Sequence, residues 1–69
     1  MSEFILEGYE YIELNKLMKI EGLVATGGEA NQLIEDGLVK VNGAVETQKR
    51  KKLRAGDKVV FEGETIVIK

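Results

Sequence analysis

The stretch "GLVKVNG", residues 37–43, decides the fold. Its apolar residues alternate with Lys40, as in a strand that buries one face. It ends on Asn42-Gly43, the strongest two-residue signal for a type I′ hairpin turn, because both central positions of that turn need a positive φ. We therefore predict a hairpin in which residues 38–41 pair with a returning strand over residues 44–47.

Two short helices are predicted before this hairpin. Over residues 12–21 the apolar residues recur at the spacing of a helix with one buried face. A second helix, over about residues 27–36, begins after Thr26, whose side chain can cap it while Glu29 reaches back in capping-box spacing. Gly37 then stands where a left-handed residue ends a helix.

Three further strands complete the pattern. The first covers residues 3–6, and Gly56-Asp57 marks a turn before strands over residues 58–62 and 65–68. The order is a strand, two helices and four short strands. We therefore expect an α+β fold in which two short helices pack on a small, mostly antiparallel sheet. The residues expected to share its core are Leu14, Leu17, Leu33, Ile34, Val41, Val59 and Phe61.

The composition limits the chemistry that these 69 residues can perform. The absence of histidine and cysteine removes the commonest general base and the thiolate metal ligands. No apolar run approaches the roughly 20 residues of a membrane span, and the start of the chain shows no targeting signal. We expect one cytoplasmic domain over residues 1–69, without a membrane partner, cofactor, metal or catalytic site.

Positive charge is concentrated in one short segment. The net charge is −2, but residues 1–47 hold three basic and nine acidic residues, a net charge of −6. Residues 48–69 hold seven basic and three acidic residues, a net charge of +4. This asymmetry favours a side that faces a polyanion. The segment over residues 49–54, called the basic loop below, contains Lys49, Arg50, Lys51, Lys52 and Arg54.

These motifs, in this order, resemble the S4 RNA-binding module. In that family two helices precede a hairpin of the pattern G-x-V-x-V-N-G, and a G-D-x-hydrophobic segment closes the small sheet, as residues 56–59 do here. The resemblance covers about residues 11–62. Within the family, the chain is similar to the small stand-alone bacterial proteins of the YbcJ type, whose sequences resemble residues 26–30 and 39–50 closely.

The resemblance implies an S4-like (αL) domain that binds structured RNA without catalysis. Ribosomal RNA or a ribosome assembly intermediate is the expected RNA partner. A ribosomal or assembly-factor protein is a second expected partner. The chain is expected to be a monomer. The larger family members carry arginines where the two helices begin. Here Glu13 and the pair Gly27-Gly28 occupy those places, so RNA is expected to contact mainly the basic loop.

Six further residues are candidates for the RNA-binding face. Paired glycines where a helix begins let a phosphate approach unpaired amides at the positive end of the helix dipole, although Glu29 can occupy those amides instead. Lysines on the first helix and on the hairpin can contact phosphates or simply be solvated. The six candidates are Thr26, Gly27, Gly28, Lys16, Lys19 and Lys40.

An alternative function remains open from the sequence. A charge run is commonly a solvated loop, and Glu46 and Asp57, which flank this one, favour that interpretation. The chain would then be a protein-interaction adaptor that docks a partner through an acidic face. Tyr11 is the one candidate for base stacking, but no exposed aromatic residue alternates with the basic loop, so phosphate and shape recognition are predicted. The acidic face consists of Glu3, Glu7, Glu10, Glu13 and Glu21.

Overall fold

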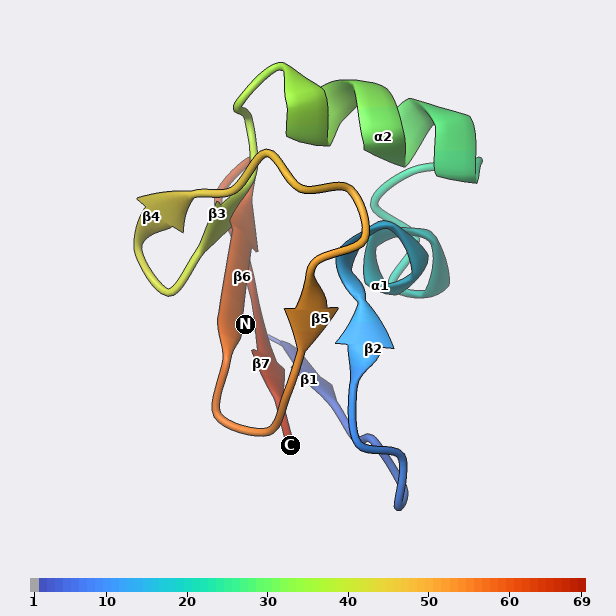
Figure 1. The fold of residues 1–69 in the computed structure, drawn as a ribbon, viewed down its shortest axis with the longest axis vertical. Helices are drawn as coiled ribbons and strands as arrows, with labels where there is room; N and C mark the ends of the chain where they lie inside the picture. Colours follow the sequence, from blue (N-terminus) through green and yellow to red (C-terminus); the bar gives the residue numbers. More distant parts are fainter. Residues whose placement is uncertain (1) are drawn as a thin grey trace.

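The sheet is built from strands that lie far apart in the sequence (Figure 1). The structure, a computed structural model, describes residues 2–69. Within that range one sheet has the order β1-β7-β6-β3-β4, and β2 and β5 form a separate pair. The elements are β1 (Ser2–Phe4), β2 (Ile12–Glu13), α1 (Leu14–Ile20), α2 (Gly27–Glu35), β3 (Lys40–Val41), β4 (Ala44–Val45), β5 (Lys52–Leu53), β6 (Lys58–Phe61) and β7 (Glu64–Ile68).

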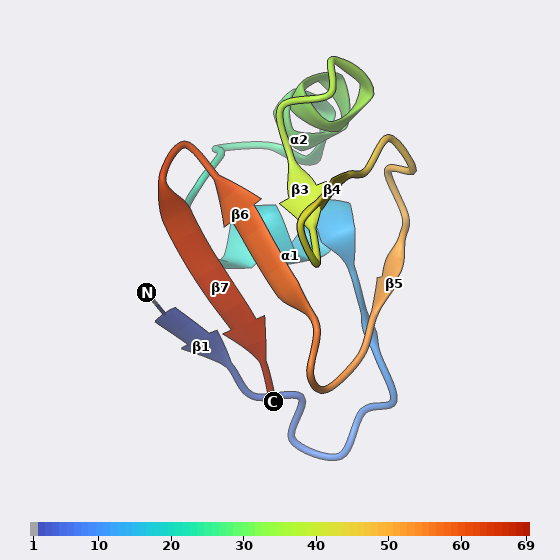
Figure 2. The ribbon, with the colours of Figure 1, turned by 90° about the vertical axis from the view of Figure 1, so that its left-hand side faces the viewer.

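Helix α1 covers one face of the larger sheet, and α2 packs against α1 (Figure 2). Among the described strands of this sheet, only β1 and β7 pair in parallel, and the other neighbours are antiparallel, so the expected α+β arrangement is confirmed. Figure 2 shows α1 behind the sheet and α2 above β3, past the edge of the sheet. Leu14 and Leu17 of α1 pack in one cluster with Val59 and Ile66 of the sheet. All seven expected core residues belong here, although Leu33 is only partly buried.

The predicted hairpin is present and its turn has the expected backbone. Asn42 has a φ of 53° and Gly43 a φ of 85°, the two positive values that a type I′ turn needs. The pairing is shorter than predicted, because the returning strand ends at Val45. Beyond it, the Glu46 N–H still donates to the Val39 carbonyl over 3.0 Å.

The end of α2 follows from its local sequence. Gly37 has a φ of 77°, which glycine adopts without steric cost. Its N–H donates to the Ile34 carbonyl over 3.1 Å, and the Leu38 N–H donates to the Leu33 carbonyl over 3.2 Å. These two bonds form a Schellman motif, so the predicted stop at Gly37 is confirmed.

Three predicted features of the chain are wrong. The first strand covers Ser2–Phe4 and not residues 3–6. The first helix begins at Leu14 and not at residue 12, because Ile12–Glu13 forms β2. The predicted order of a strand, two helices and four strands also lacks β2 and β5, which pair antiparallel, and β5 lies within the basic loop. The reason is burial: Leu53 of β5 is fully buried in the core. Neither helix of the described chain is long and apolar enough to cross a membrane.

Candidate nucleic-acid interface

The backbone of the basic loop is docked on the first turn of α1. The N–H of Leu14 donates to the Lys51 carbonyl over 2.9 Å, and the N–H of Asn15 donates to the Lys49 carbonyl over 3.1 Å. The first N–H groups of a helix have no partner inside the helix, and Glu13, at the N-cap, makes no side-chain cap bond. The basic loop therefore caps α1 with its own carbonyls.

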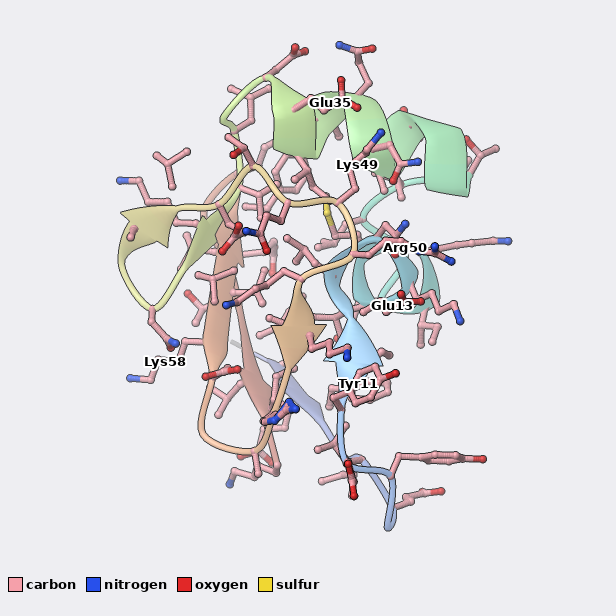
Figure 3. The ribbon with its side chains drawn as sticks, in the orientation of Figure 1. Tyr11, Glu13, Glu35, Lys49, Arg50 and Lys58 are labelled. Carbon is pink, nitrogen blue, oxygen red and sulfur yellow. The ribbon has the colours of Figure 1, made fainter. Side chains whose placement is uncertain are left out.

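Two ion pairs hold side chains of the basic loop against α2 and the end of β2 (Figure 3). Lys49 Nζ lies 2.8 Å from Glu35 Oε1 on α2, and Arg50 Nε lies 3.2 Å from Glu13 Oε2. Glu13 Oε1 is also 3.3 Å from Lys16 Nζ on α1. Ion pairs with exposed partners contribute about 0.2–1 kcal/mol each, so they orient these cations more than they stabilise the fold.

Tyr11 lies beside the other end of the basic loop. The centroid of its ring is 5.0 Å from Lys52 Nζ and 5.7 Å from Arg54 Cζ, both within cation–π range. The pairing of β2 with β5 produces this contact, because Tyr11 directly precedes β2. The sequence placed no exposed aromatic residue within the basic loop, but the fold brings one to it.

The lysine candidates outside the basic loop are not all gathered at it. Lys16 is connected to the basic loop through Glu13. Lys19 is exposed on the same helix. Lys40 is exposed on β3 in register with Val45 and Val60, on the sheet face opposite the buried neighbour Val41. Lys40 therefore lies on the face that the helices do not cover.

The glycine pair of α2 keeps its amides available. Thr26 Oγ1 accepts a hydrogen bond from the Glu29 N–H over 3.1 Å, as the capping box predicts. The Glu29 carboxylate accepts from the Ala25 N–H over 2.8 Å, outside the helix. Within residues 2–69, the N–H groups of Gly27 and Gly28 have no hydrogen-bond partner. Glu29 thus does not occupy the glycine amides, and the pair stays a candidate for phosphate contact.

Three residues of the expected acidic face make contacts within the chain. Glu13 holds Arg50 and Lys16, Glu3 pairs with Lys69, and Glu21 accepts a hydrogen bond from the Ser2 hydroxyl over 2.9 Å. Glu13 therefore belongs to the surroundings of the basic loop and not to a separate acidic surface.

Asp57 anchors the end of the basic loop. One carboxylate oxygen accepts from the Arg54 N–H over 2.8 Å, and the other accepts from Asn42 Nδ2 over 3.0 Å. Burial raises the pKa of Asp57, but these hydrogen bonds and the nearby charges of Lys51 and Arg54 outweigh it, so the pKa falls below its ordinary value of 3.8. This carboxylate, which the sequence presents as a flanking charge, fixes the loop in place.

Comparisons with known proteins agree with this architecture. The family model described as S4 domain matches residues 4–69. The "Putative RNA-binding protein YbcJ" of Escherichia coli (strain K12) is 43% identical over 68 residues, which cover 99% of this chain and 97% of that protein. The "Uncharacterized protein YbcJ" of Shigella flexneri matches with the same identity and coverage.

A solved structure is also similar. The solution structure of Escherichia coli YbcJ, described as revealing an ALFAL (αL) motif involved in RNA-binding, superposes with a TM-score of 0.75 at 43% identity. The superposition covers 99% of this chain and 86% of that one. The covered part of this chain includes the helices, the sheet and the basic loop.

Proposed function

Because this chain belongs to the S4 domain family, we propose that it is a non-enzymatic module that binds structured RNA. Ribosomal RNA is the proposed partner, and the basic loop makes most of the contacts. The observation that carries the proposal is the docking of the loop backbone on α1, which directs its carbonyls inward and leaves its cations at the surface. The Escherichia coli relative is named "Putative RNA-binding protein YbcJ", and its solution structure is described with a motif involved in RNA-binding, which supports the same function.

A docked loop is suited to phosphate recognition. The hydrogen bonds from Leu14 and Asn15 fix its backbone before any ligand arrives, so less conformational freedom is lost on binding. Arg50, whose side chain is 77% exposed, and Lys49, whose side chain is 47% exposed, are accessible to a phosphate despite their ion pairs. Phosphate oxygens can replace the carboxylates of Glu13 and Glu35 at these cations.

The expected binding is strongly dependent on salt. Each neutralised phosphate of a single strand contributes about −0.7 to the log-log slope of affinity against salt concentration. Five such contacts would weaken binding roughly a hundredfold between 50 and 200 mM salt. Contacts of this kind position the RNA and recognise its shape, and they carry little sequence information.

The proposal is tested with two double variants that remove the same charge. Arg50→Gln with Lys52→Gln changes the basic loop. Lys58→Gln with Lys69→Gln changes basic residues outside it, and Figure 3 shows Lys58 on the side of the molecule away from the helices. Fluorescence anisotropy with an RNA hairpin gives the affinity at several salt concentrations, and circular dichroism checks the fold of each variant.

We expect the basic-loop variant to bind about tenfold more weakly at low salt, with a log-log slope reduced by about 1.4, and the control to bind much as the unchanged protein does. Equal losses in both variants would show that only the overall charge matters. If the unchanged protein binds no RNA at low salt, the proposal fails and the adaptor hypothesis gains support. The ribosomal and protein partners, the monomeric state and the cytoplasmic location stay predictions.

A further inference from the structure

A groove of about 580 Å³ lies next to the basic loop, between β1, the segment that leads into β2, and α1. Its walls are largely apolar and aromatic, and they include side chains that a folded chain usually buries. Ile20 is 61% exposed and Tyr9 is 76% exposed. The apolar and aromatic wall is formed by Phe4, Leu6, Tyr9, Tyr11, Ile12 and Ile20.

We propose that this groove holds one unpaired RNA base, placed beside the phosphates that the basic loop binds. This inference rests on the proposed function and names the part of the RNA that reaches beyond the loop. Tyr11 joins the two sites, because its ring lines the groove and also contacts Lys52 and Arg54. Glu13 joins them too, since it lines the groove and holds Arg50.

The charges at the groove favour a base over a phosphate as its occupant. Glu10 and Glu13 are part of the lining, and their carboxylates repel a phosphate. A base is uncharged and planar, and unstacked bases of RNA commonly stack on tyrosine rings. The phosphates on either side of that base would be held by Lys16, which also lines the groove, and by Lys52 and Arg54 at Tyr11.

The same charges argue against an apolar protein segment in the groove. Such a segment would cover the aromatic and aliphatic wall, but it would bring no negative charge to Lys16, Lys52 and Arg54. A nucleotide satisfies both requirements, because it presents an aromatic face and an anionic backbone in one unit.

The experiment compares RNA hairpins that share one stem. The first is blunt, the second carries a short unpaired extension at its 5′ end, and the third carries one at its 3′ end. The readout is the ratio of the affinity for an extended hairpin to that for the blunt one, so that a change in binding to the shared stem cancels. The variants are Tyr11→Leu, which removes the ring, and Tyr11→Phe, which keeps it.

We expect one of the extended hairpins to bind the unchanged protein about tenfold more tightly than the blunt hairpin, as the stacking of one base on an aromatic ring allows. Tyr11→Phe should keep that ratio, and Tyr11→Leu should bring it close to one. In NMR spectra of the unchanged protein, the amides of Tyr9 and Ile20 should shift with that extended hairpin and not with the blunt one.

Two results would overturn the inference alone. One is equal affinity for all three hairpins, and the other is a gain from the extension that survives in Tyr11→Leu without shifts at Tyr9 or Ile20. Either result would leave phosphate binding by the basic loop intact. An apolar protein segment would then be the candidate occupant of the groove. If the protein binds none of the three hairpins, the proposed function is overturned, and the base site with it.

Discussion

The side-chain amide of Asn42 donates a hydrogen bond to the carboxylate of Asp57 over 3.0 Å, and this contact connects the β3–β4 turn to the turn before β6. Asn42 Oδ1 in turn accepts from the Lys58 N–H over 3.0 Å. The two sequence motifs that carry the family resemblance, N-G and G-D, therefore contact each other directly. Since Asp57 also accepts from the Arg54 N–H, the contact fixes the end of the basic loop to the sheet.

We expect the Asn42–Asp57 pair to contribute measurably to stability. Asp57→Ala should lower the free energy of unfolding by about 1–2 kcal/mol, because it leaves the Arg54 N–H and the Asn42 amide without their acceptor. Asn42→Gly removes the other partner and tolerates the positive φ of this position. Urea unfolding of both single variants and of the double variant should give a coupling of about 0.5–1.5 kcal/mol. Strict additivity would contradict the contact.

The stability should also depend on pH through Asp57. Because its pKa is lower in the folded chain than the ordinary 3.8, its contribution is fully present above that value and is lost as the pH falls through the folded pKa. We expect the difference in unfolding free energy between the unchanged protein and Asp57→Asn to be constant above about pH 5 and to shrink in more acidic solution. A difference that grows toward acid pH would show that the pKa of Asp57 is raised.

Hydrogen exchange tests whether the basic loop is docked on α1. The amides of Leu14 and Asn15 donate to carbonyls of the basic loop, whereas those of Gly27 and Gly28, at the equivalent place in α2, have no partner within residues 2–69. We therefore expect Leu14 and Asn15 to exchange at least about tenfold more slowly than the two glycines, after correction for intrinsic rates. Equally fast exchange at both helix starts would mean that the loop is undocked in solution.

The parts of the fold that depend on local chemistry were predictable from the sequence. The turn at Asn42-Gly43 and the helix end at Gly37 need positive φ values, which few residue types adopt. A single asparagine or glycine in the sequence is therefore enough to predict each of these features. The β2–β5 pair was missed because it joins two-residue strands that lie far apart in the sequence. One signal was present: Leu53 alternates with Lys52 and Arg54, as in a strand with one buried face.

The candidate site was predictable in charge but not in contacts. The basic loop stands out in the sequence because four of its five charges are consecutive. Its partners Glu13, Glu35 and Tyr11 lie in other parts of the chain, and only the packing of the fold brings them to the loop. Glu13 illustrates the difference, because it belongs to an acidic face in the sequence and to the cationic site in the structure.

Glu13 is expected to restrain RNA binding. Its carboxylate neutralises Arg50 and Lys16 and would repel phosphates bound nearby. In Glu13→Gln that charge is gone while the side chain keeps its size. We expect the affinity for an RNA hairpin at low salt to rise about threefold, as for the removal of a unit charge about 7 Å from one phosphate in water.

The control for this prediction is Glu64→Gln, which makes the same charge change at an exposed residue on β7, outside the contacts of the basic loop. Anisotropy titrations should show a smaller gain for it than for Glu13→Gln, and the free energy of unfolding of Glu13→Gln should fall by no more than about 1 kcal/mol. Weaker binding by a folded Glu13→Gln protein would contradict the prediction. It would mean that Glu13 aids binding by holding Arg50 in the orientation in which it contacts RNA, and that this effect outweighs the repulsion.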